Sequence, residues 1–310
     1  MSLVVVALGG NALLRRGEPL TLEAQEANAR VACRALAPLA EEHDLVITHG
    51  NGPQVGLLAL RSEAYDATRP QPLDVLGAES EGMIGYLLER GLRSVMPGRP
   101  VAALLTQVSV DADDPAFGRP TKPIGPVYDE DEAHRLADER KWAITRDGEG
   151  WRRVVPSPRP RGILELETIR LLVEHGVVPI CAGGGGVPVT VGIDGRVAGV
   201  DGVIDKDATA ALLARQLQAD LLVLLTDVDG VMLDHGSPEA RVLRRVTPEA
   251  LRDLELPESS MGPKAAACAD FVESTGGRAA IGRLDRAAAV VRGEAGTQVE
   301  ARPRPNLRPS

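Results

Sequence analysis

The segment LVVVALGGNA, residues 3–12, joins an uninterrupted apolar run, LVVVAL (3–8), to a turn rich in glycine. A run without polar alternation indicates a strand buried on both faces, and such strands belong to parallel sheets covered by helices. The run follows two residues that carry neither a basic leader nor a cleavage site of small residues. We therefore interpret it as a buried strand rather than a signal peptide.

The rest of the chain repeats this pattern. Further apolar runs of strand length are LVIT (45–48), VAALLT (101–106), VVPICA (177–182), LLVLLT (221–226) and AAIG (279–282). Stretches with helical character lie between them, at 22–43, 79–95, 164–175, 207–218, 262–275 and 285–293. Strands that alternate with helices are typical of β-α-β units. We predict an α/β fold, a three-layer αβα sandwich with a mainly parallel central sheet.

The composition excludes some classes of function. The 310 residues carry a net charge of −9 with a pI of about 5.2, which argues against non-specific binding to nucleic acid. No run approaches the ~18 apolar residues of a membrane span. Cys33, Cys181 and Cys268 lack the spacing of a metal site, and we expect them to be core thiols in a reducing cytoplasm.

One long segment, residues 111–160, breaks the pattern. It has no long apolar run, it is rich in proline and charge, and it holds four of the seven aromatic residues. An insertion of this length inside a compact domain is seldom a bare loop, so we predict a lid subdomain within a main domain of residues 1–299. We expect residues 300–310 to form a flexible tail.

Glycine or polar turns follow four of the predicted strands. These turns are LGGNA (8–12), THGNGPQ (48–54), AGGGG (182–186) and TDVDG (226–230). One such turn alone is usually only a turn, but four at the carboxyl edge of one sheet predict a shared crevice for an anionic ligand. No turn matches a P-loop, and LGGNALL lacks the G-x-G-x-x-G spacing of a dinucleotide site.

Lysine is rare in this chain. Only four of the 35 basic residues are lysine, namely Lys122, Lys141, Lys206 and Lys264. The lysine ammonium group is a compact point charge on a flexible stem, which suits a site where negative charge moves. Lys206 and Lys264 stand at predicted helix starts and Lys122 stands in the lid. We expect Lys141 to be an ordinary surface residue.

The polar neighbours of these lysines allow more than one interpretation. Asp207 is either a helix cap or the carboxylate that orients the lysines and keeps them protonated. Asp205 is interpreted as structural. His49 follows a strand, and a packing or backbone role is favoured over a catalytic one.

Several motifs together closely resemble the carbamate kinases of the amino acid kinase superfamily, from about residue 3 to about residue 299. The motifs are GGNA, THGNGPQVG, DPAFGRPTKPIGP, RRVVPSPRP, AGGGGVPV, GVIDKDATA, LLTDVDGV and SMGPK, in the order of the family. PTKPIGP with RRVVPSP is the most specific, because the lid that carries it is characteristic of carbamate kinases. The resemblance implies reversible, Mg²⁺-dependent phosphoryl transfer between ATP and carbamate. It also implies a homodimer whose sheets join across the interface. Members of the family usually run the reaction towards ATP, in arginine or related catabolism.

The resemblance also implies roles for residues. Lys206 and Lys264 would flank the transferred phosphoryl group, Asp207 would organise them, and Lys122 would reach in from the lid. The C-terminal lobe, about 177–299, would hold the nucleotide. The carbamate and phosphoryl side would consist of Gly9, Gly10, Asn11, Gly50, Asn51 and Gly52. The nucleotide side would consist of Thr226, Asp227, Val228, Val231 and Gly262 together with Lys206 and Lys264. No protein ligand for Mg²⁺ is evident from the sequence.

The chain departs from the family pattern in two motifs. Relatives more often have glutamine after the serine of LGAESEGMIGYLLERG, and their GPFY-like segment is GPVY here. The first departure can alter the dimer interface or a wall of the crevice. Two other interpretations remain open: an acetylglutamate or aspartate kinase relative, and a non-catalytic nucleotide-binding homologue. The lid argues against the first, and the three retained lysines argue against the second.

Overall fold

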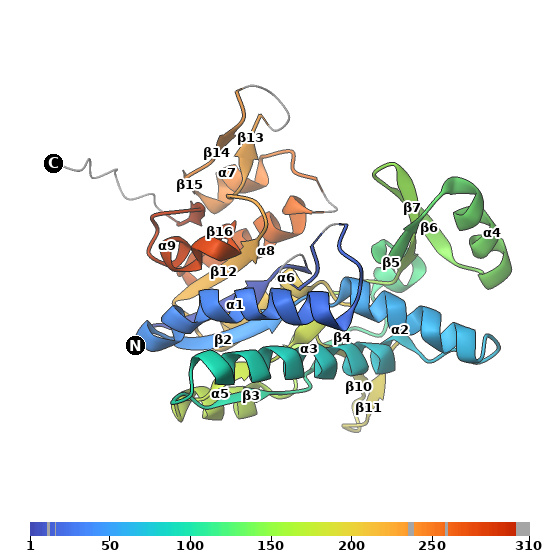
Figure 1. The fold of residues 1–310 in the computed structure, drawn as a ribbon, viewed down its shortest axis with the longest axis horizontal. Coiled ribbons are helices and arrows are strands. Elements are labelled where there is room, and N and C mark those ends of the chain that lie inside the picture. Colours follow the sequence, from blue (N-terminus) through green and yellow to red (C-terminus); the bar gives the residue numbers. More distant parts are fainter. Residues whose placement is uncertain (11–12, 16, 235–238, 258–259, 302–310) are drawn as a thin grey trace.

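The computed structural model describes residues 1–10, 13–15, 17–234, 239–257 and 260–301 (Figure 1). Its centre is an eight-stranded sheet. In spatial order the strands are β15 (Arg245–Val246), β17 (Thr297–Val299), β16 (Arg278–Arg283), β12 (Leu221–Thr226), β1 (Leu3–Leu8), β2 (Asp44–His49), β9 (Val178–Ile180) and β3 (Val101–Ala103). β17 runs antiparallel to β16, β15 runs parallel to β17, and the other neighbours are parallel. The mainly parallel sheet is confirmed.

Strand β1 lies in the middle of this sheet, paired with β2 on one side and β12 on the other. Val4, Val6 and Leu8 face one hydrophobic core, whereas Val5 and Ala7 face a second core. Both faces are therefore covered, which explains why the run contains no polar residue.

Helices cover both faces of the sheet, as predicted for a three-layer sandwich. One core packs against α1 (Leu22–Glu42), α3 (Leu73–Val95) and α9 (Ala287–Val291). The other packs against α5 (Leu166–Glu174), α6 (Lys206–Gln216), α7 (Pro248–Arg252) and α8 (Met261–Thr275). Figure 1 shows α1 and α3 lying side by side along one face.

Some predicted boundaries are wrong. The helix predicted over 79–95 begins at Leu73. In place of the helix predicted over 285–293, the structure has a short 3-10 turn, Leu284–Arg286, followed by α9 (Ala287–Val291). The strand predicted over 101–106 ends at residue 103, where the chain crosses to a smaller sheet. Helix α2 (Gly52–Tyr65) was not predicted, because its opening glycine and proline also fit a turn.

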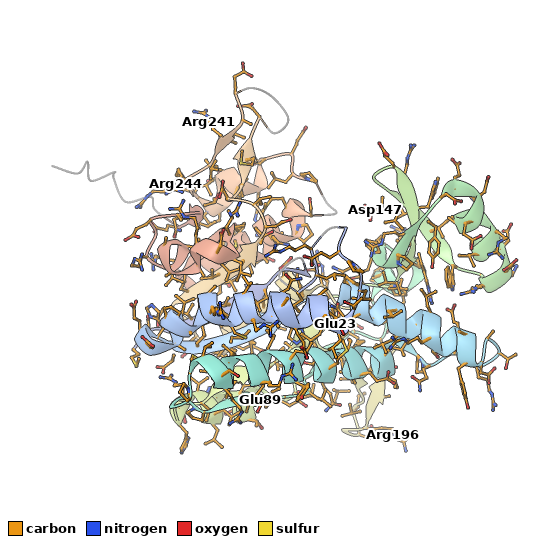
Figure 2. The ribbon with its side chains drawn as sticks, viewed as in Figure 1. Glu23, Glu89, Asp147, Arg196, Arg241 and Arg244 are labelled. Atoms are coloured by element: carbon orange, nitrogen blue, oxygen red, sulfur yellow. The ribbon has the colours of Figure 1, made fainter. Side chains whose placement is uncertain are left out.

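Two smaller sheets flank the central one. The four-stranded sheet consists of β11 (Val197–Gly199), β10 (Val187–Val191), β4 (Gln107–Val110) and β8 (Pro160–Ile163) in spatial order, and β13 (Met232–Leu233) pairs with β14 (Arg241–Val242). Figure 2 shows Arg196 and Arg241 on the outside of these two sheets.

Among the Asp, Glu, Lys and Arg side chains that the structure describes, only Glu81 and Asp207 are buried. No helix in the described part of the chain is long and apolar enough to cross a membrane.

The chain between β4 and β8 forms a separate small unit beyond helix α2 (Figure 1). It contains a 3-10 turn (Pro115–Gly118), β5 (Lys122–Tyr128), α4 (Glu130–Arg140), β6 (Ala143–Asp147) and β7 (Gly150–Val155). The antiparallel sheet has the order β5-β7-β6. Ile124 and Val155 at its root pack against α2. A Cβ atom on Gly56 of α2 would lie 2.1 Å from the Cα atom of Gly125, so the two backbones touch where both residues are glycine.

Candidate active site

The glycine turns after β1 and β2 meet each other and the end of β12 at the carboxyl edge of the sheet. The Gly9 amide donates to the Leu225 carbonyl at 2.8 Å, and the Gly50 amide donates to the Leu8 carbonyl at 3.1 Å. A Cβ atom on Gly50 would lie 3.2 Å from the Gly10 nitrogen. Turns that are far apart in the sequence therefore form one surface where backbone groups approach closely.

Lys206 lies against this surface. A Cβ atom on Gly50 would lie 3.2 Å from the Lys206 Cδ atom, so the glycine leaves room for the lysine stem. Lys206 is the first residue of α6, where the helix dipole already favours negative charge. The turn and the helix start therefore face the same small volume.

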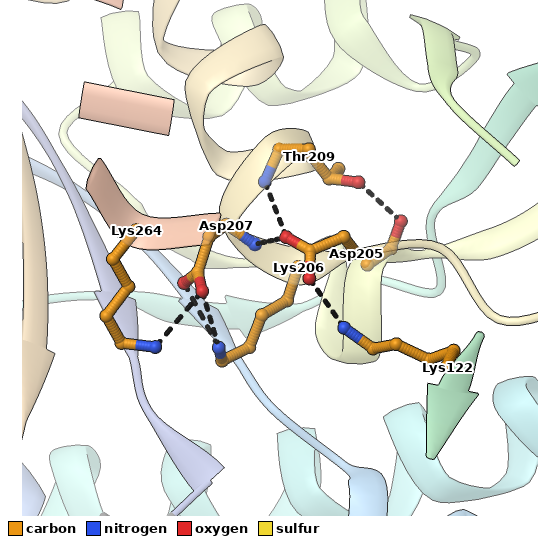
Figure 3. Close-up of polar contacts among 8 residues, drawn as sticks. Lys122, Asp205, Lys206, Asp207, Thr209 and Lys264 are labelled. Atoms are coloured by element: carbon orange, nitrogen blue, oxygen red, sulfur yellow. Dashed lines mark hydrogen bonds and ion pairs between the residues drawn. The ribbon is translucent and has the colours of Figure 1, made fainter. Parts of the chain in front are cut away.

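Asp207 joins two of the predicted lysines (Figure 3). Its carboxylate accepts from Lys206 Nζ at 3.0 and 3.1 Å and from Lys264 Nζ at 3.1 Å. Only 4% of its side chain is exposed, so the pair of ammonium groups holds a buried negative charge. Of the two roles that the sequence left open for Asp207, this geometry favours the orienting one.

The two lysines differ in their electrostatics. Burial alone would lower the pKa of Lys206, but the charges of Asp207 and Asp205 outweigh burial and raise it. Burial lowers the pKa of Lys264, and the charge of Lys206 adds to this effect although Asp207 opposes it. Lys206 therefore keeps its proton more firmly than Lys264 does.

Asp205 has a larger part than the sequence suggested. One carboxylate oxygen caps α6 by accepting from the Asp207 and Ala208 amides, each at 3.0 Å. The other oxygen accepts from Lys122 Nζ at 2.5 Å. Burial would raise the pKa of Asp205, but Lys122 and Lys206 hold it well below its usual range. Lys122 thus docks on the helix that carries Lys206 (Figure 3).

The AGGGG turn closes another side of the site. Ala182 and Gly184 both have left-handed backbone conformations. A Cβ atom on Gly184 would lie 2.1 Å from the amide of Asn51, the residue before α2, so a side chain there would displace Asn51. Asn51 in turn donates to Ser80 at 2.8 Å. Helix α3 thereby supports a predicted substrate residue, a contact that the sequence did not reveal.

His49 is buried and donates from Nδ1 toward the Gly50 carbonyl at 3.2 Å. Burial lowers its pKa to about 4, so the ring is neutral near pH 7. A Cβ atom on Gly183 would lie 2.3 Å from the ring. These contacts favour the packing role over the catalytic one.

The remaining predicted residues are not all at the edge of the crevice. Gly52 opens α2, and Gly262 is the second residue of α8, two positions before Lys264. Thr226 ends β12, and Asp227 and Val228 follow it. Val231 is fully buried, and its amide and carbonyl pair with Thr297 and Leu243, so the structure does not bring it to the crevice. Asn11 lies outside the described residues.

This site suits the movement of a phosphoryl group. Phosphoryl transfer depends mainly on positioning and charge stabilisation. The site supplies positive charge from the two lysines on one carboxylate, from the start of a helix and from backbone amides in the glycine turns. It does so without a general base. The fold and the site together define an α/β phosphotransferase.

Comparisons with known proteins agree with this class. The model of the amino acid kinase family matches residues 2–283. The chain is 52% identical to a carbamate kinase of Rhizobium meliloti over 301 residues, which cover 96% of this chain and 93% of that protein. A carbamate kinase of Pyrococcus furiosus is 47% identical, with 96% and 98% covered. The structure of a carbamate kinase from Giardia lamblia bound to AMP-PNP is similar with a TM-score of 0.86 at 36% identity, covering 96% of this chain and 98% of that one. The chain belongs to the amino acid kinase family and, within it, to the carbamate kinases.

Proposed function

We propose that this protein transfers a phosphoryl group reversibly between MgATP and carbamate at the Lys206–Asp207–Lys264 cluster. The observation that carries the proposal is the carboxylate of Asp207, which holds both ammonium groups beside the Gly10 and Gly50 turns. Carbamate is already an oxyanion, so the reaction needs no general base. What it needs is positive charge that lets two anions approach in line.

Each part of the site has a proposed role. Lys206 and Lys264 stabilise charge on the transferring oxygens, and backbone amides of the glycine turns add hydrogen bonds. Gly9, Gly10, Asn11 and the Gly50–Gly52 segment contact the carbamate and phosphoryl side. Thr226, Asp227, Val228 and Gly262 contact the nucleotide, within a C-terminal lobe of about 177–299. These assignments follow from the resemblance and from the positions of the described residues.

Mg²⁺ enters with the nucleotide in this proposal. The described residues contain no group of three His, Cys, Asp or Glu side chains placed to hold a metal ion. Mg²⁺ dehydrates reluctantly and is commonly bound by phosphates and water, so MgADP and MgATP are written as the substrates. The chain's own contribution is then the lysines that face the phosphates.

The subdomain of residues 111–160 is proposed to act as a lid. Its Lys122 reaches Asp205 at the start of α6, and so a residue of the insertion already lies next to the lysine cluster. A closed lid excludes water, which would otherwise accept the phosphoryl group or hydrolyse the acyl phosphate.

A homodimer is proposed on the edge of the central sheet. β3 is an edge strand, and Leu105 just after it is 56% exposed. Met83 and Tyr86 of the neighbouring helix α3 are also exposed. Arg93 and Glu89 of α3 bond the Val101 carbonyl and the Ala103 amide at this edge, so the exposed apolar face, rather than the strand edge itself, is what suits a second copy. We place the protein in the cytoplasm, where its three free thiols stay reduced, and we propose ATP formation in arginine or related catabolism.

The test is ATP formation from MgADP and carbamoyl phosphate, measured with luciferase. Acetylglutamyl phosphate and acetyl phosphate serve as alternative donors in parallel. We expect strong turnover with carbamoyl phosphate alone. Tight binding of MgADP without turnover on any donor would overturn the proposal in favour of a binding role.

A further inference from the structure

Two of the Asp, Glu, Lys and Arg side chains in the described part of the chain are buried, and Glu81 is one of them. The other, Asp207, is neutralised by Lys206 and Lys264. Glu81 takes part in no ion pair among the described residues, and only 3% of it is exposed. A buried carboxyl group without a cation needs another explanation.

The contacts of Glu81 are with the backbone of the crevice wall. Its Oε1 accepts from the Gly183 amide at 2.7 Å, and its Oε2 accepts from the Thr106 amide at 3.3 Å. The Thr106 hydroxyl in turn accepts from the Ala182 amide at 2.9 Å. Glu81 and Thr106 therefore hold two successive amides at the start of the AGGGG turn.

The neighbouring residue on α3 holds the opposite part of the same site. Ser80 accepts from the Asn51 side-chain amide at 2.8 Å, and Gly184 leaves no room between its backbone and Asn51. Two consecutive residues of one rigid helix thus fix the Gly183–Gly184 turn against Asn51. A change in the bond between Glu81 and Gly183 would alter this spacing directly.

We propose that Glu81 is a positioning residue for the anionic-substrate side of the crevice and that it acts in its neutral, protonated form. A protonated carboxyl group has one oxygen free to accept and one hydroxyl that also donates. Both oxygens of Glu81 accept from backbone amides, and the geometric feature that favours the neutral form is burial of the carboxyl group with no cation paired to it among the described residues. The inference rests on the proposed function, because the substrate is taken to be an anion.

The groups around Glu81 favour the neutral form. Burial is the main cause that raises its pKa to about 8. The bonds from the Gly183 and Thr106 amides and from the Thr106 side chain oppose this, and the charge of Glu165, the residue before α5, adds to the rise. His49 at the end of β2 is neutral because burial lowers its pKa to about 4. Burial also raises the pKa of the Cys181 thiol after β9 above its usual range. None of these groups supplies a positive charge near pH 7.

Ionisation of Glu81 would act on substrate binding. Above about pH 8 a negative charge would lie directly behind the turn that adjoins Asn51. An anionic phosphoryl donor would then be repelled across a medium of low dielectric constant. Only the protonated fraction of the protein would bind well, so the apparent affinity would fall with that fraction.

The test compares the wild-type protein with Glu81→Gln, the neutral isostere, between pH 6.5 and 9.5. For the wild type, KM for carbamoyl phosphate should rise by up to about ten-fold per pH unit above pH 8, while kcat changes little. For Glu81→Gln, KM should lose this rise. An equal rise of KM in both proteins would overturn the inference.

Urea unfolding supplies a readout that does not depend on activity. The folded-state pKa of Glu81 lies above the unfolded value, so its stabilising contribution is complete below about pH 4.5 and is lost as the pH rises through about 8. The stability of Glu81→Gln relative to the wild type should therefore grow from pH 5 to pH 8 and then level off. A difference that is constant with pH would contradict the neutral form. If the wild type makes no ATP from carbamoyl phosphate at pH 7, the proposed function fails, yet this comparison still decides the charge of Glu81.

A second variant covers the case in which Glu81→Gln does not fold. Glu165→Gln removes the carboxylate that raises the pKa of Glu81 and leaves Glu81 in place. The midpoint of the KM rise should then move to lower pH than in the wild type. An unchanged midpoint would count against Glu81 as the titrating group.

Discussion

Lys122 and Asp205 form an ion pair of 2.5 Å that joins the inserted subdomain to the first turn of α6. The residues are 83 positions apart, and about a quarter of each side chain is exposed. The same carboxylate caps the helix on which Lys206 stands. Docking of the subdomain and the placement of the lysine cluster are therefore linked through one side chain.

This link predicts non-additive stability. Asp205→Asn should keep the helix cap, because asparagine is a good cap, but lose the charge that binds Lys122. Lys122→Met removes the other partner. The free energies of unfolding in urea of the two single variants and the double variant should deviate from additivity by about 0.5–3 kcal/mol. Additive losses would show that the two residues are not coupled.

Lysine at position 206 should be required for rapid turnover. Lys206→Arg keeps the positive charge but replaces the point cation between Asp207 and Gly50 with a planar fork that needs more room. We expect kcat to fall by about 10² or more in the carbamoyl phosphate assay, while the protein stays folded. Lys141→Arg, at an exposed position after α4, is the matched control. Near-normal turnover of Lys206→Arg would refute the need for a point charge.

The contact between Gly56 and Gly125 should not tolerate a side chain. Gly56→Ala would place a methyl group 2.1 Å from the Gly125 Cα atom, so the subdomain must move away from α2. We expect faster proteolysis within residues 111–160 and lower kcat, since Lys122 moves with the subdomain. Gly77→Ala is the control, because a Cβ atom at that helical position meets nothing within 4 Å. This variant should raise the free energy of unfolding by about 0.4–1 kcal/mol. Equal behaviour of both variants would contradict the prediction.

The cysteines should be unreactive in the native protein. Cys33, Cys181 and Cys268 are at most 1% exposed, and burial raises the pKa of the Cys33 thiol to about 12. Thiolate is the reactive species, so the native protein should react slowly with Ellman's reagent. After denaturation all three thiols should react. Inactivation that follows rapid labelling of a native thiol would contradict this arrangement.

The proposed dimer face can be tested with one charge. Leu105→Glu places a carboxylate at the exposed edge beside β3, where a second copy would bury it without a partner. Light scattering after size exclusion should show a dimer for the wild type and a monomer for the variant. Leu171→Glu is the control, because Leu171 is also exposed, at 55%, but lies on α5. A monomeric wild type would reject the dimer.

Much of the fold could be predicted from the sequence, because strands covered on both faces must be apolar along their whole length. The segment 3–8 and the segment 221–226 were therefore recognised with their bounds. Helix α2 was missed because Gly52, Pro53 and Gly56 are all typical of turns. In the structure the proline occupies the first turn, where no amide partner is needed, and Gly56 makes room for Gly125.

The candidate site was only partly predictable. Glycine turns and rare lysines are local signals, and the structure brings Gly10, Gly50, Lys206 and Lys264 together. At Glu81 the sequence showed only a departure from the family pattern. A glutamate in a helix usually faces solvent, so nothing indicated that this one is buried. Its bond to Gly183 spans 102 positions, and no local pattern encodes such a contact.

The central position of β1 has a consequence for how the chain is made. Residues 3–8 are synthesised long before β12, yet the amide of Leu3 donates to the Asp220 carboxylate, and Val4 pairs with Leu221 of β12, 217 positions further on. Until then β1 can pair only with β2, and its other edge stays open. Long-range parallel pairing is slow, and an open apolar edge promotes aggregation. A nascent chain that stalls before residue 221 would expose this edge, so the chain is most prone to aggregate before β12 has been synthesised.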